Sequence, residues 1–131
     1  MTKVVDKRKY IIYLKKAEDF IHAAEHSLKE DEYDPAVSSA VHSAINASDS
    51  LSVFYSSKRH DGKHEDALDT IKGILSNEEY KEISKQYSGL IELKNEAEYQ
   101  PYHIGASHAN DAVRRASRIL TKVKGKLPAS K

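Results

Sequence analysis

Apolar residues recur at alternating steps of three and four along most of this chain, a period that α-helices satisfy and β-strands do not. In the first stretch, Leu14, Ala17, Ile21, Ala24 and Leu28 follow this spacing, which places all five on one side of a helix. The pattern predicts one long amphipathic helix over residues 6–29, opened by an aspartate N-cap at its first position.

Start and stop signals divide the remaining chain into further helices. Asp34 followed by Pro35 is typical of an N-cap and a first helical position, so a second helix is predicted from there to about residue 57. A short third helix is predicted to end near residue 75. Ser76 and Glu79 have the spacing of a capping box for a fourth, and a fifth is predicted from Ser107 to Gly125.

Five helices with short connections and no convincing strand predict an all-α fold, an antiparallel up-and-down four-helix bundle with an additional short helix. The length of 131 residues fits a single domain over residues 1–131, with a core at about 8–124 and a flexible basic tail at 125–131. Alanines line the inner stripes of the second and fifth helices, so their backbones are expected to approach closely.

The absence of cysteine favours a reducing, cytoplasmic location. No apolar run reaches the roughly 18 residues of a membrane span, and the first residues lack the apolar region of a signal peptide. His22, Glu25 and His26 match the zinc-protease pattern His-x-x-Glu-His, but no third ligand is fixed by spacing, so no metal is expected. No glycine-rich phosphate loop predicts a cofactor. Both ends of the chain are basic, which fits either solvated helix faces or a nucleic-acid footprint.

The stretch from Lys94 to His103 concentrates reactive side chains where one helix stops and another starts. It contains a cation, an amide (Asn95), carboxylates, two phenols and an imidazole, and Pro101 disfavours helix just before it. Junctions between rigid helices can bring side chains together around a ligand without disturbing the core. Residues 94–103 are therefore the first candidate site, with Glu98, Tyr99 and Tyr102 as candidate binding residues.

The second helix carries a second face that its core stripe does not explain. His42, Asn46 and Asp49 lie at steps of four and three, with Ile45 and Val53 among them. One interpretation is a partner surface, most simply a symmetric homodimer contact. The other is a mixed exposed face with a polar pair of no special role.

These features together resemble the HEPN (higher eukaryotes and prokaryotes nucleotide-binding) domain family. The resemblance rests on the order of helices, the small-residue second helix over residues 41–51, the turn Gly62-Lys63-His64 and the Lys94–His103 junction, and it covers about residues 8–124. It implies a helical bundle that often dimerises. It also implies a link to RNA or nucleotides, with many members acting as RNases in toxin–antitoxin or defence systems or beside small nucleotidyltransferases.

The family's catalytic signature is an arginine, a polar residue, four to six further residues and a histidine. Lys94 stands in place of the arginine, Asn95 matches the polar residue, and His103 follows after seven residues. If the site is active, the resemblance implies metal-independent RNA cleavage, in which His103 acts as general base, Lys94 stabilises phosphate charge and Asn95 orients it.

Other HEPN subgroups have a basic residue followed by an acid and a tyrosine, here Glu98-Tyr99, and are less clearly nucleases. Two functions therefore stay open. One is a nucleotide-binding, RNA-binding or protein-interaction module with a nucleotidyltransferase, antitoxin or other defence partner, and the other is a metal-independent RNase.

Overall fold

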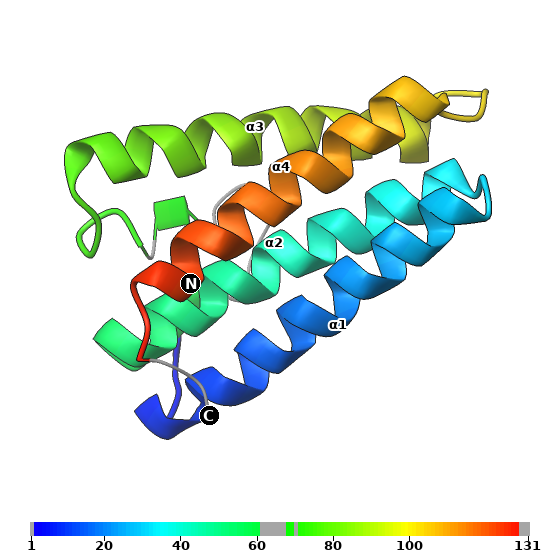
Figure 1. Ribbon diagram of the computed structural model, residues 1–131. Helices are drawn as coiled ribbons and strands as arrows, with labels where there is room; N and C mark the ends of the chain where they lie inside the picture. The colour runs from blue at the N-terminus through cyan, green and yellow to red at the C-terminus, as the bar shows by residue number, and fades with distance from the viewer. Residues whose placement is uncertain (1, 61–67, 70, 129–131) are drawn as a thin grey trace.

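The computed structural model describes residues 2–60, 68–69 and 71–128. The described residues contain four long helices: α1 (Tyr10–Lys29), α2 (Tyr33–Ser56), α3 (Asn77–Tyr99) and α4 (Ala106–Gly125). Figure 1 shows them side by side as an antiparallel bundle. The predicted all-α bundle is confirmed.

The helix starts follow local capping rules in two of the predicted cases. Asp6 does cap the first helical segment, since its carboxylate accepts from the backbone N–H of Arg8, but that segment is a 3₁₀ turn (η1, Lys7–Lys9) before α1. The capping box at the start of α3 is complete, with Ser76 and Glu79 each accepting from the other's backbone N–H. The first turn of the predicted first helix is therefore a 3₁₀ turn instead of α-helix.

Helix α2 is central and packs against the other three, so both of its sides need small or apolar residues. The alanines of its inner stripe and those facing it on α4 have no exposed surface: Ala40, Ala44, Ala47, Ala109, Ala112 and Ala116. Close approach of α1 and α2 also lets the buried Ser43 hydroxyl donate to the carbonyl oxygen of Ala17 at 2.7 Å. The expected close contact of small-residue stripes is present.

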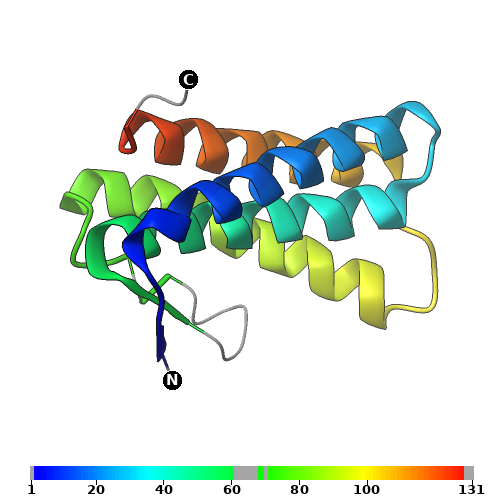
Figure 2. The same cartoon turned by 90° about the horizontal axis from the view of Figure 1, so that it is seen from below.

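Figure 2 shows that both chain ends lie at one end of the bundle, while the α1–α2 and α3–α4 connections lie at the other. The N-terminal cations and the lysines in the last turn of α4 therefore share one end of the bundle. The junction after α3 lies at the opposite end, beside the acidic α1–α2 connection.

A small antiparallel ladder joins β1 (Thr2–Val4) to β2 (Lys58–His60), where no strand was predicted. Ser57 has a left-handed conformation with φ of 53°, which ends α2 and turns the chain back toward β1. Three-residue strands leave no detectable alternation, and their pairing joins distant parts of the chain.

The predicted short third helix is only partly formed in the described residues. Residues 68–69 are in a 3₁₀ conformation, and residues 71–75 form turns in which the N–H groups of Ile74 and Leu75 donate to the Ile71 carbonyl at 3.0 and 3.3 Å. The apolar pattern was nevertheless informative, because Leu68, Ile71 and Leu75 are buried. Ala67 and the Gly62-Lys63-His64 turn lie outside the described residues.

Candidate functional site

The α3–α4 junction is formed as its proline predicted. Helix α3 ends at Tyr99, and Gln100 is extended with φ −89° and ψ 147°, the conformation that a following proline favours. Helix α4 begins at Ala106, one residue before the predicted Ser107, with Gly105 as its N-cap. The connection over residues 100–105 therefore projects from the end of the bundle.

Asp34 is the residue that organises this connection. Its Oδ2 lies 2.7 Å from Nδ1 of His103, and its Oδ1 accepts from the backbone N–H of Ile104 at 3.0 Å. The hydrogen bond to His103, then the one to Ile104, hold the pKa of the Asp34 carboxyl below its usual value. One carboxylate thus fixes the α3–α4 connection against the start of α2.

The predicted role of Asp34 as N-cap of α2 is wrong. Helix α2 begins two residues before the predicted first position, at Tyr33, with Glu32 in the cap position and no side-chain capping bond. The Asp34 carboxylate is engaged by His103 and Ile104 instead. Asp34 lies where the α1–α2 and α3–α4 connections come together, so its carboxylate bonds to the α3–α4 connection instead of capping its own helix.

Lys94 lies near the end of α3 with its side chain mostly buried. Its Nζ is 3.4 Å from Oε2 of Glu98 and 5.7 Å from the centre of the Tyr99 ring, and 14% of the side chain is exposed. It lines a cavity of about 260 Å³ together with Asp34 and Pro35 at the start of α2. The cation is therefore held inward, paired with an acid and close to an aromatic ring.

His103 borders a neighbouring cavity of about 330 Å³, which also has Asp34 and Pro35 in its wall. Its side chain is 96% exposed, so Nε2 is accessible while Nδ1 is bound to Asp34. Lys94 and His103 thus border different depressions, and Asp34 and Pro35 line both. The predicted catalytic residues do not line one common cavity, and Asn95 lines neither of these two.

The other predicted junction residues are at the surface. Asn95 and Glu98 are exposed on α3, and Tyr99 and Tyr102 are 72% and 56% exposed. Exposed aromatic rings of this size have a face available for stacking on a ligand.

His42 and Asn46 lie on an uncovered part of α2. The His42 ring stacks on Phe20 of α1 with 5.2 Å between ring centres, and the Asn46 amide donates to the His42 backbone carbonyl at 2.8 Å. Both border a surface depression of about 530 Å³ between α1 and α2.

Asp49 does not belong to this exposed face, because only 2% of it is exposed. Its Oδ2 lies 3.5 Å from Nη2 of Arg59 on β2, and Val53 is buried on the same side. Burial raises the pKa of the Asp49 carboxyl to about 6, against the opposing effect of Arg59. The β1–β2 ladder covers this half of the face, which the helical spacing could not reveal.

The described part of the chain contains no cluster of three histidine, cysteine or carboxylate residues able to hold a metal ion. None of its helices combines the length and apolar content needed to cross a membrane.

Comparison with known proteins places almost the whole chain in one family. The model of the HEPN domain family matches residues 10–126. No curated protein matches the chain. The matched segment includes all four helices and the junction between α3 and α4.

Proposed function

The chain belongs to the HEPN domain family, and we propose that it is a module that binds single-stranded RNA or its nucleotides at the α3–α4 junction. The observation that carries the proposal is the pair of depressions that Asp34 and Pro35 both line. One contains the cation of Lys94, and the other is bordered by the Asp34-bound imidazole of His103.

The side chains around the depressions suit this ligand. Lys94 supplies a charge for a phosphate, and the exposed rings of Tyr99 and Tyr102 offer faces on which unpaired bases can stack. Lys94 and His103 border different depressions, which favours binding over cleavage, since cleavage needs the base and the charge-stabilising group around one phosphate. A lysine also lacks the forked grip of arginine on a phosphate.

A metal-independent endoribonuclease is the second candidate, and the Asp34–His103 bond favours it. A carboxylate bound to Nδ1 orients an imidazole and leaves Nε2 to take a proton. In this mechanism His103 accepts the ribose 2′-hydroxyl proton while the 2′-oxygen attacks the phosphorus. The bond from phosphorus to the 5′-oxygen breaks, which leaves a cyclic phosphate on one fragment and a 5′-hydroxyl, protonated from water, on the other. Lys94 stabilises the developing phosphate charge and Asn95 orients the phosphate.

One set of measurements tests both candidates. Fluorescence anisotropy of a labelled single-stranded decanucleotide in EDTA gives binding, and a denaturing gel of the same mixtures gives cleavage. Stacking on tyrosine is worth about 1–3 kcal/mol per base, so Tyr99→Ala and Tyr102→Ala should each weaken binding at least about fivefold, as should Lys94→Ala. The exposed Lys81→Ala on the same helix is the matched control and should bind as the wild type does.

The outcomes separate the candidates. Intact RNA together with weakened binding by the junction variants supports the binding module. Cleavage that disappears in His103→Ala but persists in His22→Ala, a change at an exposed histidine on α1, supports the ribonuclease instead. Equal affinity of wild type, junction variants and control would refute a ligand site at the junction.

The proposal includes a cytoplasmic homodimer with a nucleotidyltransferase or antitoxin as partner. Support for the dimer is the uncovered surface where Phe20 and His42 stack across α1 and α2. Sedimentation should give a dimer that His42→Glu converts to a monomer, and a wild-type monomer at high concentration would refute this part. Absence of cysteine supports the location.

A further inference from the structure

The outer side of α4 carries a regular row of cations. Arg114, Arg118, Lys122 and Lys126 occur at every fourth position, and no acid follows Asp111 in the chain. Four residues of α-helix advance about 6 Å, so the cations form a stripe along the helix. Arg118 and Lys122 are exposed, and the part of the chain that the structure describes contains no ion pair to either.

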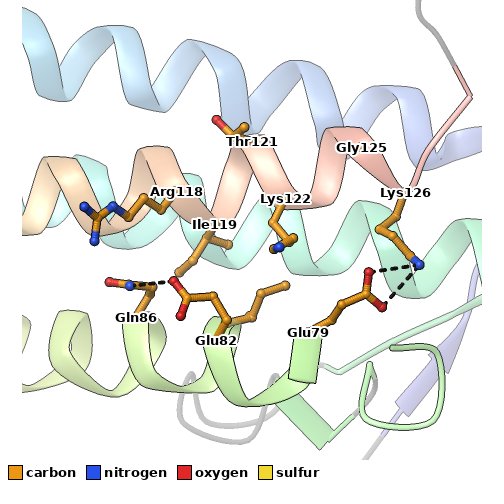
Figure 3. Close-up of a pocket in the computed structure, with 10 residues that line it drawn as sticks. Glu79, Glu82, Gln86, Arg118, Ile119, Thr121, Lys122, Gly125 and Lys126 are labelled. Atoms are coloured by element: carbon orange, nitrogen blue, oxygen red, sulfur yellow. Dashed lines mark hydrogen bonds and ion pairs between the residues drawn. The ribbon is translucent and has the colours of Figure 1, made fainter. Parts of the chain in front are cut away.

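Beside this stripe, α3 and α4 border a groove of about 470 Å³. Its lining has three cations (Arg118, Lys122 and Lys126) against two carboxylates (Glu79 and Glu82), and of these two only Glu79 is in an ion pair within the described part of the chain. Figure 3 shows Glu79 paired with Lys126, whose Nζ lies 3.1 Å from Oε2, and Glu82 accepting from the amide of Gln86 at 3.0 Å. The cations of Arg118 and Lys122 at this groove have no such partner drawn. The groove is therefore a place where added negative charge would be attracted.

The stripe also connects the two ends of the bundle. Arg114 borders a second depression, of about 590 Å³, together with Ser107 and His108 in the first turn of α4 and with Asp111, the acid to which Arg114 is ion-paired. That turn follows directly on the junction, while Lys126 lies beyond the last turn, at the basic end. A ligand lying along α4 would thus pass from the junction, over the Arg114–Asp111 ion pair, to the cations of Arg118 and Lys122.

The floor of the groove distinguishes between polyanions. Ile83 and Ile119 line it, yet 1% and 0% of their surfaces are exposed. An amphipathic acidic peptide would need accessible apolar pockets for its anchoring side chains. A nucleic-acid backbone needs only evenly placed positive charges.

We infer that the α4 stripe is the track for the sugar-phosphate backbone of a single-stranded RNA whose end lies at the α3–α4 junction. The inference rests on the proposed RNA-binding function and extends it to a second surface. Phosphates of the strand pair with Arg118 and Lys122, and the junction holds the terminal nucleotides. Affinity therefore depends on strand length, because only longer strands reach the middle of α4.

The test compares labelled oligouridylates of two lengths, a trinucleotide and a decanucleotide, across a salt series. The double variant Arg118→Ala/Lys122→Ala removes the two unpaired cations. The control Lys81→Ala/Lys85→Ala removes the same charge from exposed positions, which helical geometry places on the opposite side of α3 from the groove.

For the decanucleotide, each lost phosphate contact should lower the slope of log affinity against log salt by about 0.7, so the double variant should lose about 1.4. Its affinity at low salt should fall about tenfold, with the control unchanged. The trinucleotide should bind all three proteins equally.

Failure of the inference is distinguishable from failure of the proposed function. If the trinucleotide binds and the decanucleotide shows the same slope with the double variant, the track is refuted while the junction site stands. If neither oligonucleotide binds, both are refuted. Binding of a polyglutamate peptide as tight as that of the decanucleotide, with the same loss in the double variant, would assign the stripe to an acidic protein instead.

Discussion

Asp49→Asn should stabilise this protein at neutral pH, although it removes one partner of an ion pair. The Asp49 carboxylate is 98% removed from solvent, and burial has a larger effect on its pKa than Arg59 at 3.5 Å. An acid whose ionised form is disfavoured by the fold weakens the fold wherever it is ionised.

The magnitude follows from the pKa difference. The folded-state pKa of about 6 stands against the ordinary value of 3.8, and each unit corresponds to about 1.4 kcal/mol, which makes about 3 kcal/mol. Because the pKa is raised in the folded state, the stabilising contribution is complete below pH 4 and is lost as the pH rises to 6. Asparagine is neutral throughout, so it avoids this loss.

The assay is urea unfolding of wild type and variant at pH 4, 5, 6 and 7, followed by circular dichroism. Other acids with lowered pKa values are common to both proteins, so the quantity to compare is the difference in free energy of unfolding. It should be near zero at pH 4 and reach up to about 3 kcal/mol in favour of Asp49→Asn at pH 7. Asp69→Asn, at an exposed position, should stay within about 0.5 kcal/mol of wild type.

Two results would refute this reasoning. A difference in free energy of unfolding between variant and wild type that does not change from pH 4 to pH 7 would mean that Asp49 has the same pKa in the folded and unfolded states. A variant less stable than wild type at pH 7 would mean that attraction to Arg59 exceeds the cost of burial. The side chain of Arg59 is 34% exposed, so its own charge retains access to water after the substitution.

Two further predictions concern contacts of α3, α4 and the junction. An alanine Cβ at Gly89 would overlap Cζ of Arg115, so Gly89→Ala should lose most of the roughly 1 kcal/mol that alanine gains over glycine inside a helix. In an Arg115→Ala background the full gain should return, and additive free energies in the double-mutant cycle would contradict the contact. Asp34→Ala should cost about 1 kcal/mol at pH 7, since it leaves the Ile104 N–H without its acceptor, and Asp34→Asn should cost less. Because the pKa of Asp34 is lowered in the folded state, its charge contributes stability above the unfolded pKa, and this contribution is lost as the pH falls. The cost of Asp34→Ala in the free energy of urea unfolding should therefore shrink on acidification. A cost that grows instead would contradict the bond to His103.

Features determined by near neighbours in the chain were predictable from sequence. The capping box at Ser76 needs only Glu79, three residues away, and the end of α3 follows from Pro101. The apolar stripes place the helices because burial repeats with the helical period. The bundle itself follows from four such stripes joined by short connections.

The β1–β2 ladder was not predictable in the same way. Its pairing joins Lys3 to Arg59 across the whole of α1 and α2, and strands of three residues carry no periodic signal. Missing the ladder also misplaced Asp49, which the helical spacing assigned to an exposed face. Arg59, a cation ten residues after the acid in the chain, was the only available indication.

Asp34 and Asp49 show one common reason why a site is harder to predict than a fold. Both are acids on α2 whose partners come from later segments. His103 is 69 residues after Asp34, and Arg59 lies on β2, after the chain has reversed at the end of α2. An N-cap and an exposed polar face are the local roles that such acids most often have, and both roles require no distant partner. Because α2 packs against the other three long helices, a carboxylate on it is more often in contact with protein groups than with solvent. The topology, which the sequence did predict, was therefore sufficient to bring Asp34 beside His103, because an up-and-down bundle places the α1–α2 and α3–α4 connections at the same end.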